Sequence, residues 1–317
     1  MAKSVLSDLR FHSEKAAFDY VEKQLWPHGP TCPHCGEAER LGRLEGVMSK
    51  PSKKHPEGVE KIGLWKCYGC RGQFTVRMGT IFEDSHLPLR LWLQAIHLLC
   101  ASKKGISTRQ LQRMLGCGMK TAWHLGHRIR FAMAPGGDVG PLGGAGKIVE
   151  ADETALTTSR KTKKPVGQHR RKPKAIVLSL VERGGHTRSV VLDHRGVARH
   201  LRKMVHQDSK LVTDKAQYYK FPPVADHESV DHSKLEWTRG EVHVNTLEGF
   251  FSVVKRGLVG VYQHVDSKHL DRYLAEFDFR QNTRVALDFN DVQREAAAIQ
   301  STKGKRLTYQ TIDSSQA

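Results

Sequence analysis

Long hydrophobic runs are absent from this sequence. No stretch of about 18 apolar residues, the length that crosses a bilayer, occurs in the 317 residues. The first ten residues, MAKSVLSDLR, also lack the apolar core of a signal peptide. We therefore expect a soluble, cytoplasmic protein with no membrane partner.

Cysteine and acidic residues are also scarce. The six cysteines include two CxxC pairs, which is typical of metal binding in a reducing compartment rather than of a disulfide framework. The chain has 51 Lys and Arg but only 33 Asp and Glu, so its formal net charge is +18 and its isoelectric point is near 9.7. This excess predicts a polyanionic partner, and we expect nucleic acid.

The composition is nevertheless that of a folded, multi-domain chain. Hydrophobic residues make up 38% of the sequence, which is enough to bury cores, and the length exceeds the usual size of one domain. Apolar residues at helical spacing predict a helix that ends at Trp26-Pro27, a buried helix from Leu87 to Cys100, and two helices over 106–131 broken at Gly116-Cys117-Gly118. Six glycines and two prolines in residues 134–147 predict a linker.

Beyond the linker the pattern favours strands. Two β-branched runs, 175–181 and 187–192, flank Gly184-Gly185 and predict a hairpin. Residues 210–213 form a further strand candidate that ends at Asp214, and residues 244–258 and 267–283 have helical patterns. The order of strands followed by helices indicates an α/β domain.

The two CxxC pairs, Cys32-Pro-His-Cys35 and Cys67-Tyr-Gly-Cys70, predict a structural zinc site, because two knuckles can supply four thiolates to one tetrahedral ion. The strand pattern of residues 72–76 would complete a zinc ribbon. Two unrelated turns with free thiols, or a redox-active CxxC, are the alternatives. Cys100 and Cys117 stand alone and are expected to be buried thiols.

Residues 106–130 have the pattern of a helix-turn-helix. The second helix carries several cations that could meet DNA phosphates or bases in the major groove. A plain helical hairpin with a solvated basic face is the alternative. The cations concerned are Lys120, His124, His127, Arg128 and Arg130.

Three carboxylates are candidates for a metal-dependent site. Asp152 follows an apolar strand start, Asp214 ends another strand, and Glu248 lies on a helix, so the three can converge. Carboxylate oxygens are the ligands that magnesium prefers. On the same helix, a separate stripe carries Asn245, Glu248, Ser252 and Lys255. The acids that compete for these roles are Glu150, Glu153, Asp193 and Glu276.

A basic segment between Ser159 and Lys174 contains eight Lys or Arg and no acid. Such a charge run is either a solvated, disordered loop or a segment that binds backbone phosphates. Its position after Asp152 favours phosphate binding.

Several of these motifs together resemble the bacterial DDE transposases of insertion-sequence family 1595. The resemblance extends over nearly the whole chain up to about Arg284. The motifs that carry it are Trp26-Pro-His-Gly, both CxxC pairs, Gly79-Thr-Ile-Phe82, the helix-turn-helix, Val149-Glu-Ala-Asp152-Glu-Thr, Leu211-Val-Thr-Asp214, His243-Val-Asn245-Thr-Leu-Glu248 through Lys255, and His269 through Asn282.

The resemblance implies a multi-domain α/β protein with an N-terminal zinc ribbon and helix-turn-helix and a C-terminal RNase H-like (DDE) mixed sheet with flanking helices. The expected parts are an N-terminal helix (1–30), the zinc ribbon (31–86), a helix-turn-helix DNA-binding region (87–133), the linker (134–147), the catalytic domain (148–290) and a polar tail (291–317) with no assigned role.

The implied activity is cleavage of insertion-sequence ends and joining of the 3′ hydroxyl to target DNA with Mg²⁺ or Mn²⁺. Asp152 and Asp214 are then the first two metal ligands. The family has either Glu or Asn in third position, so Asn245 and Glu248 both remain open; the Glu-to-Lys offset to Lys255 favours Glu248. We also expect structural Zn²⁺, action on nucleoid DNA, and a homodimer or larger assembly. The residues expected to bind DNA are Lys120, His124, Arg128, Lys163, Lys164, Arg170, Arg171, Lys172 and Arg256.

Two other functions would also account for parts of the sequence. A zinc-ribbon and helix-turn-helix regulator explains the N-terminal half but leaves the three carboxylates without a role. A DDE-like nuclease that lacks strand transfer explains both halves.

Overall fold

The structure is a computed structural model that describes residues 4–53, 55–136, 139–156, 175–192, 196–216, 219–220 and 222–306. The chain divides into two compact units. Unit 1 combines Met1–Ala101, Arg109–Ala132 and Asp291–Ala317, and unit 2 combines Ser102–Thr108 and Met133–Asn290. The N-terminal unit is thus built from both ends of the chain.

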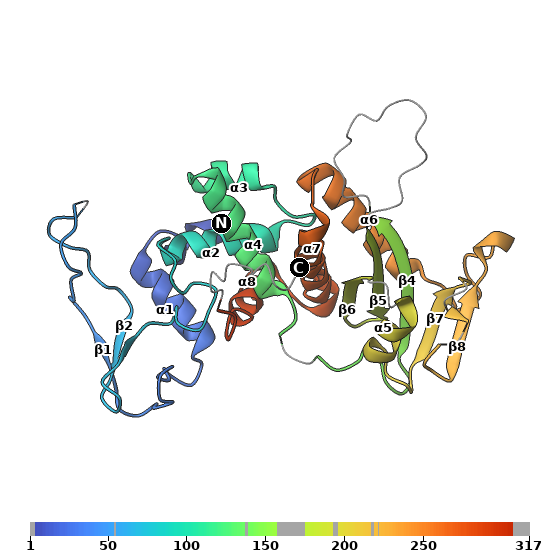
Figure 1. Cartoon of the computed structure of the whole chain (residues 1–317), viewed down its shortest axis with the longest axis horizontal. Coiled ribbons are helices and arrows are strands. Elements are labelled where there is room, and N and C mark those ends of the chain that lie inside the picture. The colour runs from blue at the N-terminus through green and yellow to red at the C-terminus, as the bar shows by residue number, and fades with distance from the viewer. Residues whose placement is uncertain are drawn as a thin grey trace, which may run out of the picture. The chain divides into compact units, whose positions relative to one another are not determined.

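Unit 1 combines a small antiparallel sheet with a group of helices (Figure 1). The strand order is β1-β2-β3, and the strands are β1 (Leu41–Leu44), β2 (Leu64–Cys67) and β3 (Gln73–Phe74). The helices are α1 (Glu14–Leu25), α2 (Leu89–Ala101), α3 (Thr108–Leu115), α4 (Met119–Met133) and α8 (Asp291–Gln300), with 3-10 turns at Val5–Ser7 and Leu9–Phe11. The predicted helices are confirmed, and β1 lies between the two CxxC pairs, where the sequence pattern predicted no strand.

Helix α1 shows why these segments fold as they do. The Ser13 side chain accepts a hydrogen bond from the Ala16 amide and so caps the helix, and the apolar residues at helical spacing are buried. Glu14 then caps a second helix, because its carboxylate accepts from the first amides of α2, Leu89 N at 2.6 Å and Arg90 N at 3.1 Å. A single turn of α1 therefore also fixes the start of α2.

Helix α8 lies in the polar segment to which the sequence assigned no role. It packs on α1 and α2. It buries Ala298 and Ile299 and also makes polar contacts: the fully buried Glu295 accepts from Arg10 at 3.3 Å and lies 2.8 Å from His97, and Arg294 donates to the Cys100 carbonyl at 3.0 Å. Because this helix is anchored by buried charged groups, an apolar pattern does not reveal it.

Unit 2 contains a mixed sheet with the strand order β6-β5-β4-β7-β8. The strands are β4 (Ile148–Leu156), β5 (Ala175–Glu182), β6 (Thr187–Val191), β7 (Lys210–Asp214) and β8 (Asp226–Val230). Strands β4, β5 and β6 are antiparallel neighbours, and β7 and β8 run parallel to β4. The predicted hairpin is confirmed as β5 and β6, and the predicted strand before Asp214 is confirmed as β7.

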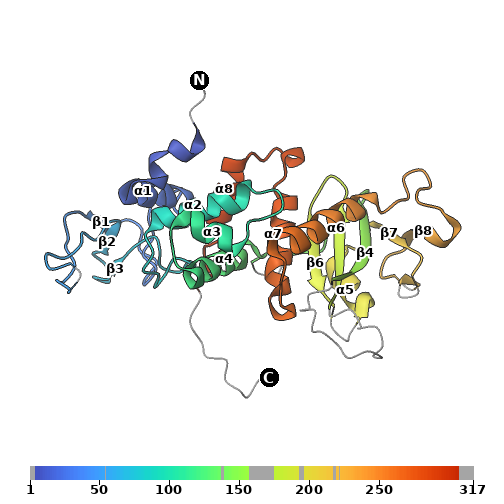
Figure 2. The same ribbon diagram turned by 90° about the horizontal axis from the view of Figure 1, so that it is seen from above.

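Helices cover both faces of this sheet (Figure 2). The helices are α5 (Gly196–Met204), α6 (Asn245–Gly257) and α7 (Leu270–Asn282). Leu178 and Leu180 of β5 pack with α5, whereas Val177 and Val181 pack with α6 and α7. Since successive strand residues point to opposite faces, β4 also presents Glu150 and Asp152 to the α6 face. Short helical turns lie at His232–Lys234, Leu258–Tyr262, Ser267–His269 and Val285–Leu287.

The second half of the expected linker belongs to unit 2. Leu142 is buried, and its amide donates to the Met204 carbonyl at 2.7 Å. The Gly143 amide donates to Glu182, and the Gly144 amide to the Ser209 hydroxyl. Gly143 has φ +92° and its Cα lies so near Ser209 that a side chain would collide with it. The glycines that suggested a linker here permit close packing.

None of the described helices combines the length and apolar composition that a membrane crossing would need.

Candidate active site and metal centres

Asp152 and Asp214 lie side by side where two neighbouring strands separate. Parallel pairing of β4 with β7 runs from Ile148↔Lys210 to Ala151↔Thr213. The next residue on each strand is an aspartate. By the alternation of side chains along a strand, both aspartates point to the face that α6 covers. The fold therefore brings together the first two carboxylates predicted from the sequence.

Glu153 joins them. Carboxylate oxygens of Asp152, Glu153 and Asp214 all lie within 4.8 Å of one another, and all three side chains are half-buried. The cluster is held by local hydrogen bonds: Asp152 accepts from the Glu153 amide at 2.8 Å, and Asp214 accepts from the Ala216 amide at 3.3 Å. The Tyr219 hydroxyl donates to Glu153 at 2.7 Å. The sequence named Glu153 as a competitor of the predicted ligands, and the fold places its carboxylate beside those of both aspartates.

The electrostatics of this cluster favour a cation. Burial, then repulsion from Asp214, raises the pKa of Asp152 to about 6. Burial also raises the pKa of Glu153 to about 7, with further repulsion from both aspartates. Carboxylates crowded in this way are costly to ionise together unless positive charge compensates them. Hard oxygen donors at these separations fit a divalent ion, so the residues present suit the metal that a DDE domain requires.

Helix α6 carries the remaining predicted active-site residues. Asn245 is its first residue, Glu248 lies one turn later, and Lys255 and Arg256 lie in its last turn; all four side chains are exposed. Glu248 is not among the carboxylates within 4.8 Å, but its charge contributes to the raised pKa of Asp152. Helix α6 thus points Glu248 toward the cluster without completing it.

The position of α6 depends on Glu150, which the sequence named only as a competitor. The N-cap residue of α6 is Val244, whose side chain makes no capping hydrogen bond. Instead, the fully buried Glu150 carboxylate accepts from the Thr246 amide at 3.0 Å, the Thr246 hydroxyl at 2.8 Å and the Leu247 amide at 3.2 Å. Arg183 pairs with Glu150 at 2.8 Å and donates to the His243 carbonyl. Two residues before Asp152 on the same strand face, Glu150 anchors the start of α6.

The other acids that competed for these roles are accounted for differently. Glu276 is fully buried and paired with Arg280, and it accepts from the Tyr262 hydroxyl at 2.6 Å. Asp193 lies outside the described residues.

The four cysteines of the CxxC pairs form a second cluster, in unit 1. The Sγ atoms of Cys32 and Cys70 are 3.7 Å apart, as are those of Cys35 and Cys67, and all four lie within 4.8 Å of one another. A tetrahedral ion with bonds of about 2.3 Å requires sulfur separations of about 3.8 Å. The cluster therefore fits structural Zn²⁺, as predicted.

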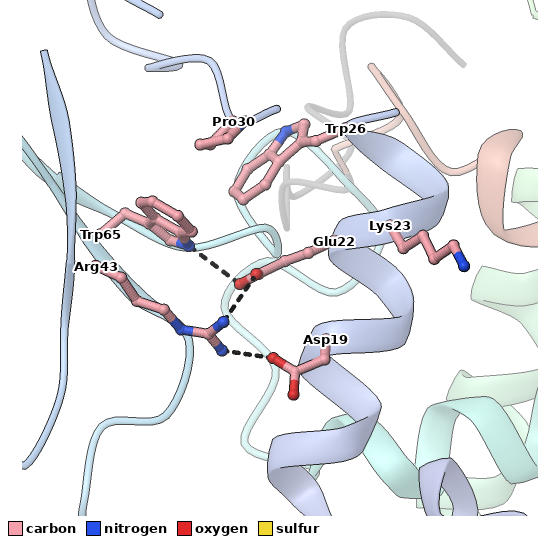
Figure 3. A pocket seen from close by; sticks show the side chains of 7 residues that line it. All are labelled: Asp19, Glu22, Lys23, Trp26, Pro30, Arg43 and Trp65. Carbon is pink, nitrogen blue, oxygen red and sulfur yellow. Dashed lines mark hydrogen bonds and ion pairs between the residues drawn. The ribbon is translucent and has the colours of Figure 1, made fainter. Parts of the chain in front are cut away.

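A small cleft joins this ribbon to α1. Arg43 lies between the carboxylates of Asp19, at 2.6 Å, and Glu22, at 3.7 Å, and the Trp65 indole donates to Glu22 at 3.1 Å (Figure 3). Trp26 packs edge-on against Trp65. The remaining residues that line the cleft are Lys23 and Pro30. Because its polar groups bond to one another, we interpret these contacts as ones that hold α1 against the sheet.

Helices α3 and α4 are the two helices that the sequence predicts over 106–131, with Gly116 at φ +63° in the turn between them. Lys120 and His124 are exposed on α4. Arg128 is half-buried and donates to the Ile81 carbonyl at 3.2 Å. The expectation that all five cations of α4 face DNA is wrong for His127 and Arg130, because the helix buries both against unit 1.

The basic segment lies outside the described residues. This concerns Lys163, Lys164, Arg170, Arg171 and Lys172. Arg256, the last residue expected to bind DNA, is exposed and donates to the Ser252 carbonyl at 3.1 Å.

Two residues that position the site were not predicted to do so. The sequence does hold a signal for Glu150, because it lies two residues before Asp152 and a strand places such residues on the same face. It holds no signal for Tyr219.

Comparison with known proteins agrees with this arrangement. A family model described as an ISXO2-like transposase domain matches residues 141–282, and one described as a transposase zinc-ribbon domain matches residues 12–73. The chain is 26% identical over 297 residues to a protein described as an uncharacterized protein in transposable element ISH50 of Halobacterium salinarum, covering 86% of this chain and 92% of that protein. The matches span the cysteine cluster and the carboxylate cluster, and they confirm the predicted family and fold class. The chain belongs to insertion-sequence family 1595 of transposases, with a zinc ribbon ahead of its DDE domain.

Proposed function

We propose that this protein cleaves the ends of an insertion sequence and joins the freed 3′ hydroxyl to target DNA in one metal-dependent site. The observation that carries the proposal is the pair Asp152 and Asp214, which lie where the parallel pairing of β4 with β7 ends and beneath a helix that carries Glu248. This arrangement accounts for the carboxylates that a DNA-binding regulator would leave unused.

The carboxylates of Asp152 and Asp214 would hold divalent ions, with Glu248 as the third ligand. Bound there, two Mg²⁺ or Mn²⁺ ions would lower the pKa of the attacking water or hydroxyl and stabilise the leaving oxygen. Asn245, one turn before Glu248, can approach the same ions. Glu150 anchors the start of the helix that carries both residues.

The exposed cations of unit 2 would hold the DNA backbone near the carboxylates. Lys255 and Arg256 lie on α6, two turns beyond Glu248, where they can bind phosphate. In unit 1, Lys120 and His124 are the α4 residues best exposed to meet DNA. Transposition brings two ends together, so we expect a dimer or larger assembly on nucleoid DNA.

Single substitutions of the carboxylates test this function. Asp152→Asn, Asp214→Asn and Glu248→Gln remove a charge with little change of volume, and each should abolish Mg²⁺-dependent cleavage and joining while end binding persists. Glu241→Gln, which removes an exposed acid in the same unit, serves as the control and should retain activity. If Asn245→Ala is inactive and Glu248→Gln is not, Asn245 is the third ligand.

Product analysis separates the alternatives. A transposase joins end DNA to target, a DDE-like nuclease yields only nicks or breaks, and a regulator leaves DNA intact. Normal cleavage by all three acid variants would refute the metal-dependent mechanism.

A further inference from the structure

Glu153 occupies a place in the active site that the DDE triad does not include. We propose that Glu153 is an additional metal ligand and that Tyr219 is the positioning residue that holds its carboxylate toward Asp152 and Asp214. The inference rests on the proposed function, because it concerns the same metal site.

The geometry of β4 explains how consecutive residues can share one ion. On a regular strand, Asp152 and Glu153 would point to opposite faces of the sheet. The pairing with β7 ends at Ala151↔Thr213, so β4 has no paired β7 residue at these two positions. The Glu153 side chain can therefore reach around the open edge, and its oxygen comes within 4.8 Å of those of both aspartates. Two ions about 3.5 to 4 Å apart could both be contacted by ligands at such separations.

Tyr219 gives the Glu153 carboxylate a fixed orientation. The Tyr219 ring is 1% exposed and lies in the core that Ala151, Leu211 and α5 form. From this buried position its hydroxyl donates to Oε2 of Glu153 at 2.7 Å. One carboxylate oxygen is thereby held, and Oε1 is left to bind an ion. Tyr219 follows Asp214 by five residues, so the segment that begins with one ligand also positions another.

Among the described residues, the positive charge that acts on this cluster is limited to a small contribution of His232 at Asp152. Among the described residues, no Lys or Arg lies within 4 Å of the carboxylates of Asp152, Glu153 or Asp214, although Lys215 nearby pairs with Asp231. Elsewhere in unit 2, the fully buried acids Glu150 and Glu276 each pair with an arginine. Three half-buried carboxylates, of which Glu153 accepts a tyrosine hydrogen bond, carry negative charge that divalent ions would compensate; a purely structural role for Glu153 would not require this crowding.

Metal binding measured directly tests the proposal. The zinc-loaded full-length chain is titrated with Mn²⁺ by calorimetry, and the bound ion is counted by electron paramagnetic resonance. Mn²⁺ prefers oxygen ligands and leaves the four-thiolate site occupied by zinc. We expect Glu153→Gln to weaken Mn²⁺ binding at least about tenfold and Tyr219→Phe to weaken it about tenfold. Glu241→Gln, which removes the same charge from an exposed position in unit 2, should bind as the wild type does.

The possible outcomes are distinct. If Glu153→Gln and Tyr219→Phe only lower the thermal unfolding temperature and bind Mn²⁺ with wild-type affinity, while Asp152→Asn loses binding, Glu153 is structural and the inference fails but the proposed function stands. If the wild type binds no Mn²⁺, both fail. Should Glu153→Gln not fold, Tyr219→Phe decides, because it keeps all three carboxylates and removes only the hydroxyl.

Discussion

Replacement of Glu150 by glutamine should destabilise unit 2 and impair the active site together. Glu150→Gln preserves the side-chain volume but replaces one carboxylate oxygen with an amide group that donates. In the wild type, Thr246, Leu247 and Arg183 all donate to the Glu150 carboxylate. In the variant, at least one of these donors would face the amide NH2 group, which also donates. The Arg183 guanidinium also loses its buried anion.

The size of the effect follows from the burial and the contacts. Glu150 is fully buried, pairs with Arg183 at 2.8 Å and accepts two amide hydrogen bonds from the start of α6. Removal of one partner of a buried ion pair costs about 3–5 kcal/mol. The favourable interaction of the carboxylate with the helix dipole, about 0.3–2 kcal/mol, is part of the same loss. We therefore expect unit 2 to lose about 3–5 kcal/mol of its free energy of unfolding.

Urea unfolding of chains labelled with 5-fluorotryptophan measures this loss. The sequence has five tryptophans, and Trp237 is the one that lies in unit 2, so its ¹⁹F signal follows that unit separately. Glu228→Gln is the matched control: it removes an acid that pairs with Lys210 and Arg239 at a half-exposed position. A pair of that kind is worth about 1 kcal/mol or less.

The comparison of the two variants decides the argument. If Glu150→Gln lowers the unfolding free energy of unit 2 no more than Glu228→Gln does, Glu150 does not anchor α6. A stable variant that has lost cleavage activity would instead show that Glu150 acts on the ions and not on the helix.

The remaining predictions concern the zinc site, pH, salt and the C-terminal helix. The chain should contain one Zn²⁺, and Cys67→Ser should lose both the ion and the folding of unit 1; unchanged zinc content would refute the site. Because the folded-state pKa values of Asp152 and Glu153 are raised to about 6 and 7, their contribution to metal-free stability is present below about pH 4 and lost as the pH rises through 6 to 7, so added Mn²⁺ should raise the unfolding temperature more at pH 8 than at pH 5. A pH-independent increment would contradict this. DNA affinity should fall steeply with salt, and the slope should become shallower when the basic segment is neutralised; an unchanged slope would exclude phosphate contacts there. The triple variant concerned is Arg170→Ala, Arg171→Ala and Lys172→Ala. Truncation after Asn290 removes α8 and should unfold unit 1 while unit 2 retains its melting transition; normal folding of unit 1 would show that the buried contacts of Glu295 are dispensable.

The sequence alone determined which chemistry the chain carries. Two CxxC pairs define a tetrahedral thiolate site whatever lies between them, because the knuckle is a local structure. The strand patterns likewise place Asp152 after the apolar start of one strand and Asp214 at the end of another. The hairpin of β5 and β6 and the helices around the site follow from periodicity and glycine turns, and the structure confirms them.

Only the tertiary structure decided which groups meet. The sequence pattern treated Glu150 and Glu153 as equivalent acids, and the fold buries one beneath α6 and places the other beside the aspartates. The fold also buries His127 and Arg130, which the helical pattern had suggested were surface cations. It places the C-terminal helix α8 in the same unit as the N-terminus. The physical reason is that local patterns reflect the backbone and the average environment of a segment, whereas the partners of a charged side chain come from parts of the chain far away in sequence. Whether such a group is exposed, capped, paired or free to bind a metal is settled only when those parts pack together.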